Sequence, residues 1–173
     1  DKIDTGEIIL QKEIEIETNE IAGTLHDKLM HLGAELVNKT VELVKKNSVT
    51  TYKQPELEEK SASKLDSSNC KINWNASLEV IYNQIRGLNP FPAAWTNIQN
   101  NEEKVSAKIY MIGKEIALHQ HEVGKIIYTK KELKVAVKNG YIIIGEIKLA
   151  GKKKMDAKSL LNGYVFSENA KMM

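Results

Sequence analysis

The chain has 173 residues, enough for one domain or two small ones. Hydrophobic residues make up 42% and charged residues 28%, which is typical of a soluble globular protein. The single cysteine, Cys70, excludes an intrachain disulfide and a cysteine-based zinc site. No apolar run approaches the roughly 18 residues that span a bilayer, and no signal peptide pattern is present, so we expect a cytoplasmic protein.

The net charge of +2 is distributed unevenly along the chain. Residues 1–50 carry 6 lysines and 10 carboxylates, a net charge of −4. Residues 72–173 carry 15 basic and 9 acidic residues, a net charge of +6. The basic second part indicates either contact with a polyanion or simply a lysine-rich surface, and charge alone favours neither.

The first fifty residues predict one strand followed by one long helix. Residues 7–17, EIILQKEIEIE, end in alternating isoleucine and glutamate, the period of a strand with one wet face. Residues 21–47 predict an amphipathic helix with a candidate capping pair, Thr24 and Asp27. Its apolar stripe comprises Leu25, Leu29, Leu32, Leu36 and Leu43. One strand cannot cover such a stripe, so we expect residues 1–50 to be the end of a larger α/β domain.

The rest of the chain predicts a linker and a second domain. Residues 51–71 are polar and contain Pro55, which indicates a linker. Beyond it, a short helix capped by Ser77 or Asn75 should end near Gly87. Short β-branched segments then predict strands within a small barrel; they cover residues 93–98, 104–112, 122–131, 132–139 and 141–151. A last short helix should begin after Asp156 and stop at Gly163, giving an α+β fold overall.

Few side chains form a recognisable site. The sequence has no phosphate-binding loop, no dinucleotide fingerprint and no H-E-x-x-H zinc motif. His119 and His121 would share a strand face, but without a third ligand they predict no metal. Lys152, Lys153 and Lys154 follow a glycine turn, where they would either neutralise phosphates or simply be solvated. Arg86, the only arginine, would either cap a helix or bind phosphate.

Five motifs, in consistent order along nearly the whole chain, resemble methionyl-tRNA formyltransferase. IDTGEII at 3–9 is similar to the family's L-D-T-G loop, and GTLHDKLMHLGAELV at 23–37 to its G-T-L helix. INW at 72–74 stands where the family has I-D-W, with Asn73 in place of the aspartate. IRGLNPFPAAWT at 85–96 and LAGKKKM at 149–155 resemble the two most specific motifs. Phe91 occupies a position that is often tryptophan, and Lys148 one that is often glutamine.

The resemblance implies a fold and a reaction. The family joins a Rossmann-like formyltransferase domain through a linker to a C-terminal barrel related to the OB-fold. We therefore expect residues 1–50 to be the end of the catalytic domain, residues 51–71 the linker and residues 72–173 an OB-like tRNA-binding domain. The family transfers a formyl group from 10-formyltetrahydrofolate to methionyl initiator tRNA, without a metal.

The resemblance also implies residue roles. Asp4 matches the family's catalytic aspartate, whose asparagine and histidine partners precede the motif, so we expect this polypeptide alone to be inactive and to lack most of the folate pocket. Arg86, Lys148 and Lys152–Lys154 are the expected tRNA contacts.

Two other classes stay open. A sugar-nucleotide formyltransferase would share the core without a tRNA-binding surface. A non-catalytic OB-type binder of single strands would need exposed aromatic rings, whereas Trp74 and Trp95 are expected to anchor the core. We expect the whole protein to be a monomer without membrane contact, although an exposed strand edge at 7–17 would allow this chain to self-associate.

Overall fold

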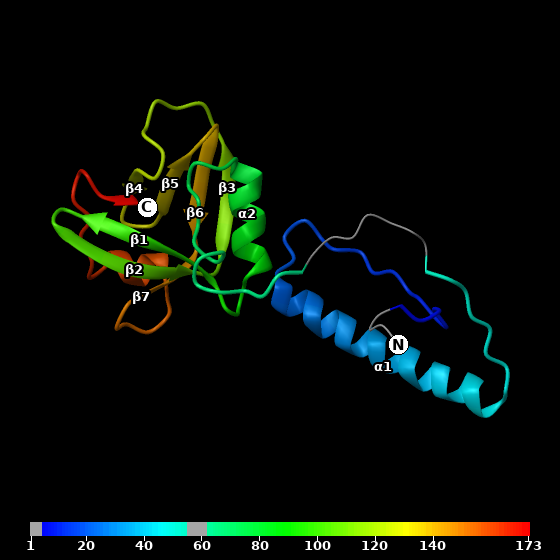
Figure 1. The fold of residues 1–173 in the computed structure, drawn as a ribbon. Helices are drawn as coiled ribbons and strands as arrows, with labels where there is room; N and C mark the ends of the chain where they lie inside the picture. The colour runs from blue at the N-terminus through cyan, green and yellow to red at the C-terminus, as the bar shows by residue number, and fades with distance from the viewer. Residues whose placement is uncertain (1–4, 55–61) are drawn as a thin grey trace. The chain divides into compact units, whose positions relative to one another are not determined.

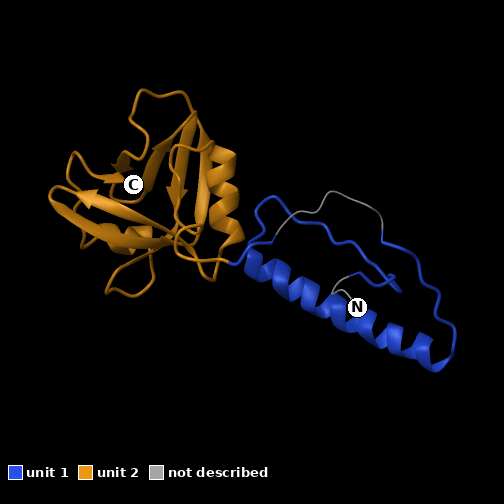
Figure 2. Ribbon diagram, in the orientation of Figure 1, with its two compact units in different colours: residues 1–64 blue, residues 65–173 orange. Residues whose placement is uncertain are grey.

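The computed structural model describes residues 5–54 and 62–173 (Figure 1). The chain divides into two compact units, residues 1–64 and residues 65–173 (Figure 2). Asp4 and Pro55 lie outside the described residues. No helix in the described ranges is long and apolar enough to cross a membrane.

The long predicted helix is present in the first unit as α1, Ala22–Lys45. The predicted Thr24–Asp27 capping pair is wrong, because the N-cap is Ile21 and receives no side-chain cap. Thr24 instead donates a hydrogen bond to the Ile21 carbonyl over 3.0 Å. At the other end, Asn47 adopts a φ of 50°, and the Ser48 N–H donates to the Leu43 carbonyl. This Schellman arrangement satisfies carbonyl groups that the end of a helix leaves open.

The predicted strand at 7–17 is not formed. Its backbone makes one isolated antiparallel bridge, in which Ile8 and Tyr52 exchange hydrogen bonds of 2.8 and 3.0 Å. Alternating side chains do not make a strand without a neighbouring backbone to complete the ladder. The self-association expected from a strand edge here therefore loses its basis.

The first unit has little interior among its described residues. No residue of α1 is buried, and Leu29 and Val37 are 47% and 62% exposed. The one buried side chain described in this unit is that of Glu20, whose carboxylate forms an ion pair of 2.8 Å with Lys28. Hydrogen bonds from Lys28 lower the pKa of Glu20, and hydrogen bonds to Glu20 and Glu17 raise the pKa of Lys28.

The second unit contains two antiparallel sheets rather than the single closed barrel expected from the sequence. The five-stranded sheet has the order β8-β7-β2-β1-β9 and the four-stranded sheet the order β3-β6-β5-β4. The strands are β1 Ala94–Asn100, β2 Glu103–Ile109, β3 Ile112–Ile116, β4 Ile126–Tyr128, β5 Leu133–Val137, β6 Gly140–Ile144, β7 Glu146–Leu149, β8 Met155–Asp156 and β9 Lys171–Met172.

The chain passes between the sheets at two adjacent places. Residues 110–111 connect β2 to β3, and Gly145 connects β6 to β7. The Gly145 N–H donates to the Met111 carbonyl over 2.7 Å, which ties the two crossings together. The segment 141–151, predicted as one strand, is therefore two strands in different sheets.

Both short helices of this unit begin at the predicted caps. Ser77 accepts a hydrogen bond from the Val80 N–H ahead of α2, Leu78–Gly87, which contacts β3 and β6. Asp156 accepts one from the Ser159 N–H ahead of α3, Ala157–Leu161. The inner side of α2 is fully buried at Ile81 and Ile85.

One core extends through the second unit. Its largest buried side chains include Phe166, Ile98, Ile109 and Ile142. Trp74 is 3% exposed and donates its Nε1–H to the Thr96 hydroxyl over 2.8 Å, so its predicted place in the core is confirmed. Trp95 packs against the same core but is only partly buried, because alternate residues of β1 face solvent.

Candidate nucleic-acid interface

The outer face of the five-stranded sheet carries a row of basic side chains around Trp95. Lys108 on β2 lies directly opposite Trp95 on β1 and Lys148 on β7. Directly opposed residues of paired strands share one face of a sheet, and all three of these are less buried than their sequence neighbours. On the other side of β1, Lys71 forms a bridge with Trp95 and places its ammonium 5.6 Å from the ring centroid.

A second row crosses the same face four residues along β1. Lys171 on β9 and Lys104 on β2 both pair with Gln99. Asn97 and Ser106, paired with each other, lie between the two rows. The face therefore combines five lysines with uncharged polar side chains, and we call Lys71, Lys104, Lys108, Lys148 and Lys171 the basic sheet face.

The charge of the basic sheet face is not neutralised within the described chain. None of its five lysines forms an ion pair with a described residue. Lys108 donates to the Pro92 carbonyl over 3.0 Å, which fixes the position of the ammonium without cancelling its charge. Glu146, two residues before Lys148 on β7 and therefore on the same face, is paired with Lys154 at 2.7 Å. Such a surface is suited to a polyanion.

One protein-family model matches most of the second unit. The model of the formyl transferase C-terminal domain matches residues 64–165. This chain belongs to the formyl transferase C-terminal domain family.

Relatives with higher similarity extend the match over nearly the whole chain. The methionyl-tRNA formyltransferase of Flavobacterium psychrophilum is 47% identical over 171 residues, which are 98% of this chain and 54% of that protein. The enzyme of the same name from Flavobacterium johnsoniae is 46% identical over 173 residues, 99% of this chain and 55% of that protein. The chain therefore spans about half the length of these curated relatives.

A solved structure shares the fold. It is the crystal structure of WlaRD, a sugar 3N-formyl transferase, in the presence of dTDP and 5-N-formyl-THF. The TM-score is 0.54 at 22% identity, over 88% of this chain and 52% of that one. The likeness shows a common fold over about half of that chain.

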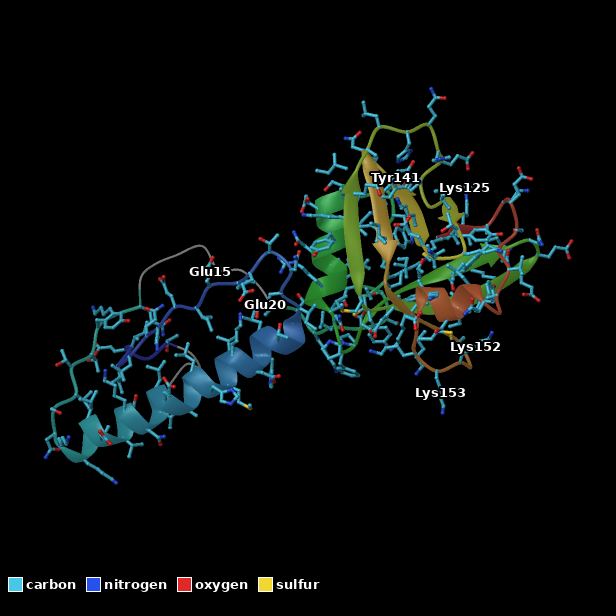
Figure 3. The ribbon with its side chains drawn as sticks, turned by 180° about the vertical axis from the view of Figure 1, so that it is seen from behind. Glu15, Glu20, Lys125, Tyr141, Lys152 and Lys153 are labelled. Atoms are coloured by element: carbon cyan, nitrogen blue, oxygen red, sulfur yellow. The ribbon has the colours of Figure 1, made fainter. Side chains whose placement is uncertain are left out.

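The lysine run of this family member lies in the turn after β7. The Lys152 N–H donates to the Leu149 carbonyl over 3.0 Å, and Gly151 adopts a φ of 74°, which closes the turn. Lys152 lies 5.5 Å from the Tyr164 ring centroid, and Lys154 is held by Glu146. Lys153 forms no ion pair with the described residues and points away from the ribbon (Figure 3). Of the three, Lys153 is the most available to a phosphate.

Arg86 belongs to a different element from the other predicted contacts, helix α2. Its Nε–H donates to the Asn83 side-chain oxygen over 2.7 Å, on the same helix. Helix α2 contacts the four-stranded sheet, whereas Lys148 and the lysine run belong to the five-stranded sheet and its turn. A phosphate contact by Arg86 therefore stays a prediction.

His119 has a local structural role. Its Nε2 lies 2.9 Å from both the Val137 and the Gly140 carbonyl oxygens, so Nε2 carries the donated proton. Its Nδ1 accepts the His121 backbone N–H over 3.2 Å, and its ring lies 4.5 Å from that of Tyr141. No group of three metal-binding side chains occurs in the described ranges.

Sequence reasoning missed four members of the basic sheet face. Lys104, Ser106 and Lys108 alternate along β2, and residues two positions apart on a strand share one face. This spacing was the one signal in the sequence that Lys104 and Lys108 lie on the same face. Lys71 and Lys171 carried no such signal, because they reach β1 from distant parts of the chain. Only the register of the strands brings these lysines to one surface.

Proposed function

We propose that this chain is the C-terminal half of a methionyl-tRNA formyltransferase. The observation that carries the proposal is identity of 46–47% to enzymes of that name over almost the whole chain. The complete enzyme would transfer a formyl group from 10-formyltetrahydrofolate to methionyl initiator tRNA in the cytoplasm. None of the described residues is assigned to the folate.

The division of labour follows the family resemblance. Residues 1–50 would be the end of a Rossmann-like catalytic domain, residues 51–71 a linker, and residues 72–173 an OB-like domain that binds tRNA. Asp4 would orient the catalytic histidine of the complete enzyme and help to remove the proton from the attacking amine. A single carboxylate supplies neither the base nor the oxyanion stabilisation that formyl transfer needs.

In the second unit, we assign tRNA binding to the basic sheet face together with Lys152 and Lys153. Lysine ammonium groups bind phosphates as point charges and release condensed counterions. Binding through this surface would depend strongly on salt and weakly on sequence. Support for this comes from the five lysines that share one sheet face without an ion pair to a described carboxylate.

The test of this surface is a salt titration of tRNA affinity. The Lys108→Ala/Lys148→Ala variant should weaken binding and reduce the slope of log K against log salt by about 1.4–1.8, since two phosphate contacts are lost. The matched control is Lys130→Ala/Lys131→Ala, which removes two exposed lysines from the turn between β4 and β5 on the other sheet. Equal slopes for the two double variants would refute the assignment.

Catalysis by the chain itself is tested separately. Incubated with methionyl initiator tRNA and formyl donor, the chain should release no formylmethionyl-tRNA above a protein-free blank. Clear turnover would show that the catalytic set is complete within these 173 residues.

The sugar formyltransferase class makes an opposite prediction. An enzyme of this class needs no tRNA-binding surface, so its tRNA affinity would be weak and would not respond to the Lys108→Ala/Lys148→Ala change. The resemblance to WlaRD at 22% identity supports the common fold, and the named relatives favour the tRNA enzyme.

A further inference from the structure

Phe91 is an exposed aromatic residue in a well-anchored loop. Its side chain is 84% exposed, in the connection between α2 and β1. The preceding Asn89 is buried and donates its side-chain amide to the Tyr110 carbonyl over 3.1 Å. The following Ala93 donates its N–H to the Leu88 carbonyl over 2.9 Å. Because the loop is fixed on both sides, it holds the ring in solvent at a defined place.

A cleft of about 490 Å³ lies beside this ring. Phe91, Pro92 and Trp95 form its apolar wall, and Ser106 and Lys108 line it from β2. The volume lies within the range of small-ligand sites. The Trp95 Nε1–H donates to the Ser67 carbonyl over 2.6 Å, which fixes the orientation of the indole.

The charges around the cleft indicate its occupant. Lys108 belongs both to the cleft and to the basic sheet face, and Lys148 lies directly opposite it. Lys71 adds a second ammonium next to Trp95. The one carboxylate in the lining, Asp66, accepts hydrogen bonds from Ser68 and Asn69, which lower its pKa and keep it bound to its own turn. An aromatic cleft that continues into a lysine surface is complementary to a base attached to its phosphates.

We propose that the cleft beside Phe91 binds one unpaired base of an RNA strand whose phosphates lie on the basic sheet face. The base stacks on the Phe91 ring, and Lys108 contacts the adjacent phosphate. This inference rests on the proposed tRNA binding, but it adds a contact that salt does not screen. Stacking on aromatic side chains tolerates all four bases, so the cleft recognises an exposed base rather than a sequence.

The experiment separates base stacking from phosphate binding. The full chain is titrated with a fluorescent single-stranded RNA oligonucleotide and with an abasic oligonucleotide of the same length and phosphate number. The oligonucleotide with bases should bind about tenfold more tightly. Phe91→Ala should reduce its affinity to that of the abasic strand, whereas Phe91→Trp should retain the difference. Removal of an 84% exposed side chain leaves the core intact, which thermal unfolding will verify.

Val165→Ala is the matched control, because Val165 is an equally prominent apolar side chain at 80% exposure. It should leave both affinities unchanged. Two outcomes would overturn the base site while leaving salt-dependent tRNA binding in place. One is equal affinity for the two oligonucleotides, and the other is a Phe91→Ala variant that binds the oligonucleotide with bases as tightly as the wild type does. Absence of any binding by tRNA and both oligonucleotides would overturn the proposed function as well. A dimer in sedimentation that Phe91→Ala dissociates would instead assign the cleft to a second copy of the chain.

Discussion

Gly124 shows how closely two backbone segments approach at one residue. It adopts a φ of 85°, and a Cβ placed on it would lie 2.3 Å from the Met172 carbonyl oxygen. Its own carbonyl accepts the Met172 N–H over 2.8 Å, and its N–H donates to the Ala136 carbonyl over 2.8 Å. Gly124 therefore joins β9 to β5 by backbone contacts that leave no space for a side chain.

We predict that Gly124→Ala destabilises the protein strongly. The left-handed conformation alone costs about 1–2 kcal/mol for an L-residue, and the overlap with Met172 adds to it. The free energy of unfolding, measured by urea denaturation, should fall by about 2 kcal/mol or more. Gly163→Ala is the control, because no described atom beyond Gly163 and its two chain neighbours lies within 4 Å of the added Cβ, and it should unfold at the wild-type midpoint or slightly above it. Equal midpoints for the two variants would contradict this account.

At the scale of elements, the short helices are fixed by local signals. Asp156 accepts hydrogen bonds of 2.8 Å from both the N–H and the hydroxyl of Ser159, which begins α3 with a charged cap. These bonds, the backbone N–H first, lower the pKa of Asp156. The ionised cap also interacts favourably with the N-terminal end of the helix dipole.

A pH-dependent contribution to stability follows from this cap. Because the folded pKa of Asp156 is depressed, its contribution is complete above the unfolded value of 3.8 and is lost as the pH falls through the folded pKa. Asp156→Asn keeps an oxygen acceptor but cannot ionise, so it should be less stable than the wild type at pH 6. The gap between their urea midpoints should narrow below pH 3. A constant gap between the midpoints of Asp156→Asn and the wild type would disprove the linkage.

The elements also show what the sequence can and cannot determine. The caps at Ser77 and Asp156 and most strands were predictable, because capping and period-2 patterns act over a few residues. The predicted strand at 7–17 is not formed, since a ladder requires a partner segment and, among the described residues, one isolated bridge to Tyr52 is all that residues 7–17 make. The sheet crossing at Gly145 was missed because residues 141–151 have the composition of one continuous strand. The basic sheet face depends on strand register, which no local pattern of lysines encodes.

At the scale of the molecule, the interior belongs to one unit. Every buried hydrophobic residue in the described chain lies between Cys70 and Met172. The same region carries the positive charge, the basic sheet face and the Phe91 cleft. The first unit instead contributes α1, a helix without a buried residue. Burial of apolar surface is the main source of folding free energy, so the two units should differ greatly in intrinsic stability.

This distribution predicts that residues 65–173 fold independently. A chain beginning at Leu65 should unfold cooperatively in urea at the midpoint of the full chain, because it retains the whole buried cluster. It should also bind the RNA oligonucleotide with the same salt dependence, since the basic sheet face and its turn lie within it. Residues 1–64 alone should show weak helicity by circular dichroism, because an amphipathic helix without a partner surface is only marginally stable. A lost or broadened transition in the 65–173 chain would mean that α1 stabilises the sheets, and the core would then have to be assigned to both units.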